Sequence, residues 1–218
     1  MSQKKIFLQS EADAWFERNK QASAKQLFAE DSVCAEIDKI IKAKSSQGKI
    51  FNILEVGCGE GLRLSWLSKE FGAMVFGVEP SKKAVAEAMK RGVIAIQGTA
   101  DFLPYENKSF DILIFGFCLY LCDQQDLFKI AHEADRVLKD DAWLIINDFY
   151  YPSSVARDYH HKPGVQSHKM DYRKLFDWHP SYVCYSHQLQ QHGLHEFCDD
   201  PQEWVSVSTM RKGSFGNV

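Results

Sequence analysis

The chain has 218 residues, 45% of them hydrophobic and 13% aromatic, which is enough apolar material for one domain with a packed core. Its formal net charge of −3 gives no electrostatic reason to expect a nucleic acid or an anionic membrane surface as the partner. No apolar run reaches the roughly 18 residues of a membrane span, and the N-terminus leads into charged residues, so we expect a cytoplasmic protein. Six scattered cysteines do not form the framework of a small secreted domain, and we expect reduced thiols.

Residues 10–43 predict two helices, the second with Val33, Ile37, Ile40 and Ile41 on one face. Short apolar runs then alternate with helical patterns. Runs that are apolar at successive positions are typical of strands covered on both faces, and their alternation with helices predicts a parallel, doubly wound sheet. The predicted strands are 50–56, 74–78, 93–97, 111–117 and 142–149.

The alternation of predicted strands and helices is interrupted after about residue 150 by a segment rich in tyrosine, histidine and proline. We interpret residues 150–180 as an insertion beside the ligand site. Residues 182–189 alternate like a strand, and residues 204–210 alternate like the last one.

A glycine-rich loop, Glu55-Val56-Gly57-Cys58-Gly59-Glu60-Gly61, follows the first strand, where the backbone of an open α/β sheet meets its ligand. A dinucleotide fingerprint has a third glycine one residue later, where Leu62 stands. Glu79 ends the second strand and can accept both ribose hydroxyls, which NAD and S-adenosylmethionine share. Glu55 would repel a pyrophosphate but suits a cationic sulfonium-bearing amino acid, so the loop favours S-adenosylmethionine.

Five motifs carry a resemblance to a known family, and they stand in the same order as in that family. They are Ile53-Leu54-Glu55-Val56-Gly57-Cys58-Gly59-Glu60-Gly61, Gly77-Val78-Glu79-Pro80-Ser81, Gly98-Thr99-Ala100-Asp101-Phe102-Leu103-Pro104-Tyr105, Ser109-Phe110-Asp111-Ile112-Leu113 and Arg136-Val137-Leu138-Lys139. Over roughly residues 50–150 the sequence resembles the class I S-adenosylmethionine-dependent methyltransferases, in particular the broad small-molecule group called type 11. The resemblance implies a Rossmann-like, mainly parallel seven-stranded sheet, with S-adenosylmethionine as cofactor and S-adenosylhomocysteine as product.

The resemblance also implies which parts of the chain do what. We expect a single methyltransferase domain, 1–218, made of an N-terminal helical lid (1–48), a cofactor-binding core (49–150), a substrate-side insertion (151–181) and the last strands (182–218). Around the methionine part of the cofactor we expect Glu55, Gly57, Cys58, Gly59 and Gly61. Glu79 and Pro80 would lie at the ribose, and Thr99, Ala100, Asp101 and Phe102 against the adenine, with Phe115 and Arg18 completing the site.

Three departures from the family pattern stand out. Thr99 replaces a usual aspartate, so the contact to the adenine amino group shifts to Thr99, the backbone or Asp101. Asp140-Asp141-Ala142 replaces a Pro-Gly-Gly turn, which should alter only a distal turn. Tyr120-Leu121 replaces a frequent His-His pair near the substrate.

A sulfonium is an activated methyl donor, so positioning of the acceptor can supply most of the rate. Candidates for a base follow the fourth and fifth strands or lie in the insertion, and Asp148 is the best placed, but a structural or solvated role is open for each, and we assign no base. The candidates are Tyr120, Asp148, Tyr150, Tyr151, His160 and His161.

Substrate specificity should reside in the N-terminal helices and in residues 150–200. Trp15 and Phe16 either pack ordinarily or form a lid over the methionine end, with Arg18 near a carboxylate. The insertion mixes tyrosines with five basic residues, which suits an anionic or aromatic small molecule and, less well, a short RNA; a solvated loop is the alternative. The basic residues are Arg157, Lys162, Lys169, Arg173 and Lys174.

Two other functions stay open at this point, in a monomer or a homodimer. An NAD-linked oxidoreductase is disfavoured by the loop spacing and by the absence of a Tyr-x-x-x-Lys pair. A non-catalytic S-adenosylmethionine-binding partner subunit is compatible with Thr99 and with Tyr120-Leu121.

A cluster of cysteine and histidine residues near the C-terminus has the spacing of a zinc site. Cys184 and His187 are followed by His192, His195 and Cys198. Strand alternation would point Cys184 and His187 to opposite faces, so we predict ordinary strand and loop residues and no metal.

Overall fold

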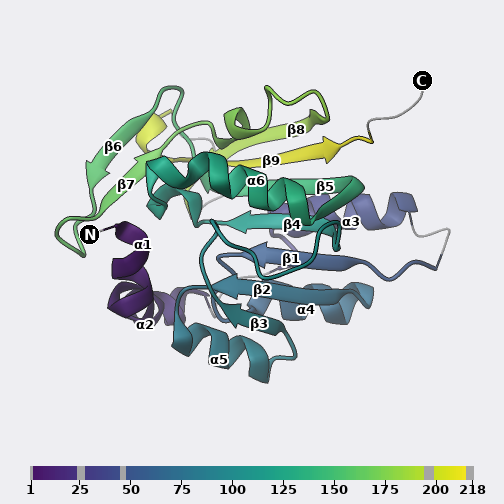
Figure 1. Ribbon diagram of the computed structural model, residues 1–218, viewed down its shortest axis with the longest axis horizontal. Helices are drawn as coiled ribbons and strands as arrows, with labels where there is room; N and C mark the ends of the chain where they lie inside the picture. Colours follow the sequence, from purple (N-terminus) through teal and green to yellow (C-terminus); the bar gives the residue numbers. More distant parts are fainter. Residues whose placement is uncertain (1, 24–27, 45–47, 194–198, 215–218) are drawn as a thin grey trace.

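The computed structural model describes residues 2–23, 28–44, 48–193 and 199–214. Its centre is a seven-stranded sheet in the order β3-β2-β1-β4-β5-β9-β8, shown in Figure 1. The first five of these strands pair in parallel, whereas β9 pairs antiparallel with both β5 and β8. The predicted α/β fold with a mainly parallel, Rossmann-like sheet is therefore confirmed.

The core strands are β1 (Asn52–Val56), β2 (Met74–Glu79), β3 (Ile94–Gln97), β4 (Phe110–Gly116) and β5 (Leu138–Phe149). They form because both of their faces are covered, as β4 illustrates: its consecutive residues 112–115 are all fully buried. The strand β5 begins four residues before the predicted start, since Asp140 and Asp141 are exposed and carry no apolar signal. Asp141 lies in the left-handed region at φ +61°, in the segment that replaces the Pro-Gly-Gly turn.

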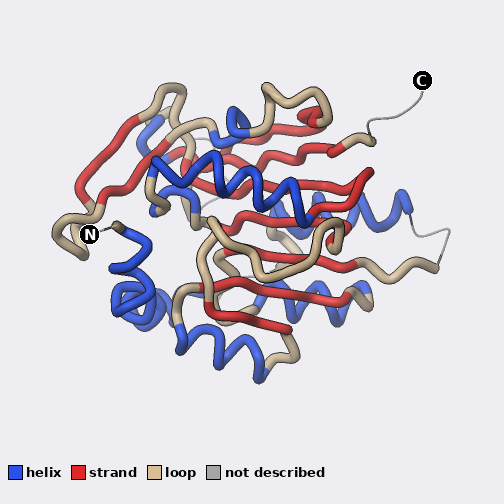
Figure 2. The backbone as a smooth tube through the Cα atoms, viewed as in Figure 1, coloured by secondary structure: helices blue, strands red, loops and turns tan. Residues whose placement is uncertain are grey.

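Helices cover both faces of the sheet (Figure 2). The helix α6 (Leu127–Val137) packs its apolar stripe on one face together with a 3-10 turn at Tyr172–Leu175. The other face is covered by α3 (Ser32–Lys44), α4 (Leu62–Phe71) and α5 (Lys82–Lys90). Parallel strands all end at one edge of such a sheet, so side chains from different strand ends meet there.

The N-terminal helical segment, residues 3–23, lies at that edge (Figure 1). It consists of α1 (Gln3–Ile6), a π-helical stretch (Phe7–Glu11) and α2 (Ala12–Ser23). The insertion forms a hairpin of β6 (Val155–Asp158) and β7 (Gln166–Lys169). Phe7 of the N-terminal helical segment and Tyr159 and Val165 of the hairpin share a small apolar cluster, so the insertion supports this segment.

The last strands are β8 (Tyr182–Gln191) and β9 (Trp204–Lys212), as predicted. However, the pairing of β8 shifts by one residue between Cys184 and Ser186. Cys184 pairs with Met210 and His187 with Ser208, and these partners lie two positions apart on β9. The expectation that Cys184 and His187 face opposite sides is therefore wrong, because the bulge restores them to one face.

The two remaining members of the suspected zinc cluster, His195 and Cys198, lie outside the described residues. Within the described ranges, no group of three or more His, Cys, Asp or Glu side chains could hold a metal ion. Over the same ranges, none of the helices combines the length and the apolar character that crossing a membrane requires.

Candidate cofactor and acceptor site

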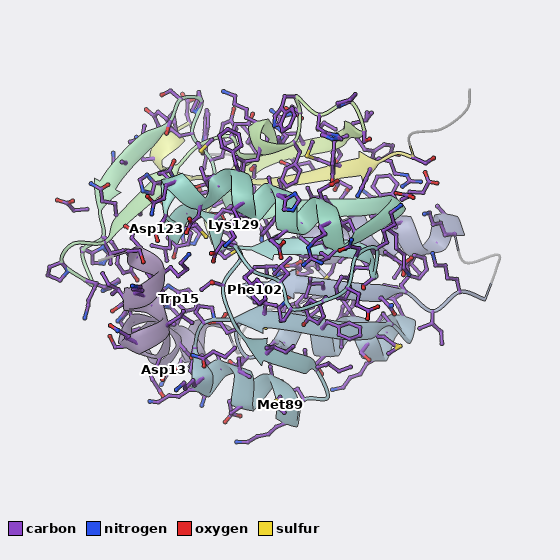
Figure 3. The ribbon with its side chains drawn as sticks, in the orientation of Figure 1. Asp13, Trp15, Met89, Phe102, Asp123 and Lys129 are labelled. Atoms are coloured by element: carbon purple, nitrogen blue, oxygen red, sulfur yellow. The ribbon has the colours of Figure 1, made fainter. Side chains whose placement is uncertain are left out.

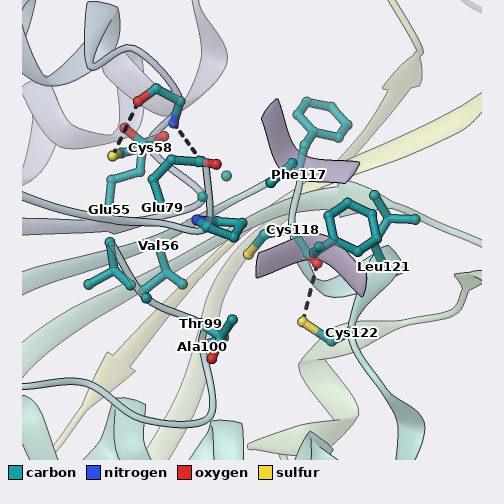
Figure 4. A pocket seen from close by; sticks show the side chains of 18 of the residues that line it. Glu55, Val56, Cys58, Glu79, Thr99, Ala100, Phe117, Cys118, Leu121 and Cys122 are labelled. Atoms are coloured by element: carbon teal, nitrogen blue, oxygen red, sulfur yellow. Dashed lines mark hydrogen bonds between the residues drawn. The ribbon is translucent and has the colours of Figure 1, made fainter. Parts of the chain in front are cut away.

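A cavity lies between the carboxyl ends of the core strands and the N-terminal helical segment (Figure 4). The cavity brings together most of the residues that the resemblance implied for the cofactor. Those that line it are Glu55, Gly57, Cys58, Gly59, Glu79, Pro80, Thr99, Ala100 and Asp101.

Two glycines of the glycine-rich loop, Gly57 and Gly59, are favoured for different steric reasons. Gly57 has φ +78°, and a Cβ there would lie 2.7 Å from the Cβ of Cys118 and 2.8 Å from the carbonyl oxygen of Gly116. Gly59 has φ +53°, yet a Cβ there would meet no atom within 4 Å. Gly57 is thus required by the packing of β1 against the loop after β4, whereas Gly59 leaves the backbone open toward the cavity.

A buried ion network forms the floor of the cavity. The guanidinium of Arg63, on α4, donates to Glu55 at the end of β1 and lies 3.2 Å from Asp31 before α3. The side chains of Arg63 and Glu55 are only 10% and 3% exposed. Burial raises the pKa of Glu55 while Arg63 opposes that rise.

Two atoms of this network have no hydrogen-bond partner, namely Oε2 of Glu55 and Nε of Arg63. Both residues line the cavity. An unpartnered carboxylate oxygen accepts from an ammonium, and an unpartnered guanidinium N–H donates to a carboxylate. The carboxylate and the guanidinium at the floor of the cavity thus have unmet hydrogen-bonding capacity, and their opposite charges match the two charged ends of an amino acid such as the methionine part of S-adenosylmethionine.

Glu79 ends β2 beside the glycine loop. Its carboxylate accepts the backbone N–H of Gly59 at 3.0 Å and that of Ser81 at 2.9 Å. Burial raises the pKa of Glu79 to about 7, although these two hydrogen bonds oppose the rise. Each carboxylate oxygen has a further lone pair, so Glu79 can still accept ribose hydroxyls.

The expected adenine wall contains a pair of polar side chains. The hydroxyl of Thr99 donates to Asp101 at 2.7 Å, and the ammonium of Lys4 lies 2.6 Å from the same carboxylate. Burial alone would raise the pKa of Asp101, but the hydrogen bonds from Lys4 and Thr99 lower it. Asp101 is therefore held ionised, and Thr99 is positioned as its partner.

The N-terminal helical segment is attached on two sides of the cavity. At one side the carboxylate of Asp123 accepts the backbone N–H groups of Gln3 and Lys4, both at 3.0 Å. At the other side Asp13 accepts the hydroxyl of Ser81 at 2.6 Å. Figure 3 shows Asp13 and Trp15 on this segment and Asp123 across from them, near α6.

Four of the expected cofactor residues lie outside the cavity lining. Gly61 packs against α5, where a Cβ would lie 3.0 Å from the Cβ of Ala88. Phe102 is 64% exposed, and Phe115 is fully buried in the core. Arg18 bonds to Glu11 at 2.5 Å and to the hydroxyl of Tyr159 at 3.1 Å.

The candidate bases also lie outside the cavity lining. Asp148 is fully buried, and its carboxylate accepts the backbone N–H groups of Leu119 at 2.7 Å and Phe149 at 2.8 Å. Burial raises the pKa of Asp148 to about 7. These contacts make Asp148 a support for the turn after β4, which itself lines the cavity.

The other candidate bases have comparable structural surroundings. Burial raises the pKa of the Tyr120 phenol, whose ring lies 4.9 Å from that of Phe149. The ring of Tyr150 packs between His187 and Trp204, and Tyr151 lies next to it in the chain. The rings of His160 and His161 are in tilted contact at the tip of the insertion, with centroids 3.7 Å apart.

An aromatic wall, here Phe7, Trp15, Phe16 and Phe117, lines the rest of the cavity. The first three come from the N-terminal helical segment, and Phe117 follows β4 with a strained φ of +49°. The carbonyl of Asn147 holds that strained residue by accepting its N–H at 2.8 Å.

Sequence reasoning missed Lys4, Phe7, Arg63 and Phe117 as cavity residues. Arg63 had a signal, because it follows the glycine loop by two residues and so begins the helix that faces the ligand. Lys4 and Phe7 had none, since their place depends on how the N-terminal helical segment docks.

Comparisons with known proteins agree with this geometry. The family described as "Methyltransferase domain" matches residues 54–146. The uncharacterized methyltransferase YcgJ of Bacillus subtilis is 28% identical over 144 residues, which cover 61% of this chain and 55% of that protein. An uncharacterized protein of Methanocaldococcus jannaschii is 39% identical over 95 residues, covering 43% of this chain and 35% of that one. The matched regions thus span about a third to a half of these curated relatives.

Solved structures share the fold at low sequence identity. A 1,6-didemethyltoxoflavin-N1-methyltransferase of Burkholderia thailandensis, solved with 1,6-didemethyltoxoflavin and S-adenosylhomocysteine, has a TM-score of 0.69 at 14% identity and covers 96% of this chain and 89% of its own. A Haloferax volcanii protein solved in complex with the Trm112 methyltransferase activator has a TM-score of 0.64 at 17% identity, covering 97% and 100%. The chain therefore has the fold of the class I S-adenosylmethionine-dependent methyltransferases, and its residues 54–146 match the methyltransferase-domain family.

Proposed function

We propose that this chain transfers the methyl group of S-adenosylmethionine to a small-molecule acceptor. Two buried atoms without partners, Glu55 Oε2 and Arg63 Nε, carry the proposal. An amino-acid ligand brings one ammonium and one carboxylate, which these two atoms can bind. The pyrophosphate of a dinucleotide would instead meet the carboxylate of Glu55 as a like charge.

Each wall of the cavity has a part in this function. S-adenosylmethionine supplies a methyl group that its sulfonium has already activated. Glu55 and Arg63 would hold the amino-acid part, Glu79 would accept the ribose hydroxyls, and the side chains of residues 99–101 would contact the adenine. The N-terminal helical segment would exclude water and orient the acceptor, and such positioning can supply most of the rate.

The proposal assigns no protein base. The buried carboxylate of Asp148 and the phenol of Tyr120 are both engaged in supporting the cavity wall.

The parts of the chain would divide these tasks. We propose that residues 1–48 cover the site, that residues 49–150 bind the cofactor, and that residues 151–181 act indirectly. Tyr159 and Val165 of the insertion pack on Phe7, which supports this last assignment.

Calorimetric titration of the cofactor-stripped protein with S-adenosylmethionine, S-adenosylhomocysteine and NADH tests the proposal. We expect micromolar binding of the first two ligands, strongly weakened in Glu79→Ala and in Arg63→Lys, and unchanged in the exposed control Lys90→Ala. Binding of NADH alone, or of none of the three, would overturn the proposal. Release of S-adenosylhomocysteine in an acceptor screen would then separate an enzyme from a binding subunit.

A further inference from the structure

On the basis of the function proposed above, the residues that line the cavity indicate which chemical class of acceptor it can bind. Two independent properties of the wall bear on it: the balance of charge and the arrangement of aromatic rings. From them we infer that the acceptor is a flat aromatic or heteroaromatic molecule that carries no negative charge, held between Trp15 and Phe117.

The charge balance of the cavity is negative. Among the described residues that line it, six are carboxylates and two are cations. The carboxylates are Glu55, Glu60, Glu79, Asp101, Asp123 and Asp126. S-adenosylmethionine adds one net positive charge, which does not reverse this balance.

Both cations are already paired. The ammonium of Lys4 lies 2.6 Å from Asp101 and 2.9 Å from Asp126. Arg63 bonds to Glu55 and Asp31, and Nε, its one nitrogen without a partner, is the atom assigned above to the cofactor. An anionic acceptor would therefore find no unpaired cation among the described residues that line the cavity.

The basic residues of the insertion do not supply that cation, because none of them lines the cavity. The ammonium of Lys169 donates to the carbonyl of Gln202 and lies 4.7 Å from the ring centroid of Phe149. Arg173 lies 2.6 Å from Asp171. The anionic alternative that their sequence suggested thus has no support in the geometry.

The aromatic rings are held in place before any acceptor arrives. Trp15 packs on the apolar cluster of Phe7, Ala12, Tyr159 and Val165. The ring of Phe117 lies 5.5 Å from that of Phe149 and 5.8 Å from that of His192. Because these contacts restrict the movement of both rings, the wall suits a rigid flat ring better than a flexible chain.

Two naphthalenes of nearly equal shape test the inference on protein saturated with S-adenosylhomocysteine. One is 2-naphthol, which is neutral at pH 7.5, and the other is 2-naphthoate, which is anionic. We expect calorimetry to show 2-naphthol binding at least ten-fold more tightly than 2-naphthoate. We also expect Trp15→Ala and Phe117→Ala each to weaken 2-naphthol binding by about ten-fold, and Trp15→Phe to restore much of it.

The exposed aromatic residues Trp178 and Phe128 provide matched controls, since they are 66% and 76% exposed and lie outside the cavity. Trp178→Ala and Phe128→Ala should leave 2-naphthol binding unchanged. Equal or tighter binding of 2-naphthoate, insensitivity to both cavity variants, or binding of neither naphthalene would overturn the inference. Binding of S-adenosylhomocysteine, measured first in every variant, reports separately on folding and on the proposed function.

Discussion

Among the side chains that line the cavity, we expect removal of the Arg63 guanidinium to reduce the free energy of unfolding the most. Replacing it by methionine keeps the apolar stem but leaves Glu55, only 3% exposed, without a compensating charge. Breaking a buried ion pair from one side costs about 3–5 kcal/mol. For a protein of this length that loss lowers the midpoint of thermal unfolding by about 10 °C.

The pH dependence of this loss in stability distinguishes an unpaired buried charge from lost side-chain packing. Burial raises the pKa of Glu55 in the folded protein, and removing Arg63 raises it further. When the pKa of a carboxyl group is higher in the folded than in the unfolded protein, the group destabilises the fold only at pH values above its unfolded pKa. The free-energy loss grows as the pH rises from the unfolded pKa to the folded pKa. Arg63→Met should therefore cost more at pH 8 than at pH 5.5, and adding Glu55→Gln should recover part of the loss.

Urea unfolding at the two pH values measures these differences, with Lys90→Met as the control. Lys90 and Glu87 form an ion pair on the surface, where Lys90 is 69% exposed, so its loss should cost under about 1 kcal/mol. A loss for Arg63→Met below about 1 kcal/mol, or an equal loss at both pH values, would refute the reasoning from a buried charge.

Three further predictions follow from neighbouring groups. Because burial raises the pKa of Glu79 to about 7, calorimetry should find S-adenosylhomocysteine bound about ten-fold more weakly at pH 6 than at pH 8, and Glu79→Gln should remove that dependence. Gly57→Ala should destabilise the protein by about 2–5 kcal/mol in urea unfolding, through its positive φ and its contact with Cys118, while a similar loss for Gly59→Ala would contradict the steric argument. The folded pKa of Asp148 is raised to about 7, so the stability of Asp148→Asn relative to the natural chain should rise between pH 4 and pH 8. A stability difference that stays constant across that range would show that this carboxyl does not titrate as described.

The sheet and the glycine loop could be predicted because their signals are local. A strand such as β4, buried on both faces, is apolar at every position, and the loop after β1 needs glycines at fixed offsets. The start of β5 was misplaced because Asp140 and Asp141 belong to the strand while remaining exposed. A register shift between Phe110 and Ile112 on β4 accompanies that irregular start.

The features that sequence reasoning missed depend on partners far away in the chain. The extra residue in β8 is defined by its pairing with β9, so alternation within β8 gives no sign of it. Asp148 resembles a candidate base in sequence, and only the backbone N–H of Leu119 at 2.7 Å reveals its supporting role. Phe7 enters the cavity wall through the docking of a segment that the glycine motifs do not specify.

The close approach of Glu55 to Gly116 has a consequence for how this site can vary among related sequences. A Cβ at Gly116 would lie 2.5 Å from Oε1 of Glu55, so a side chain at position 116 would displace that carboxylate. An aspartate in place of Glu55 would withdraw the carboxylate by one methylene and free that space. The two positions should therefore covary, with glutamate accompanied by glycine and aspartate compatible with alanine or serine.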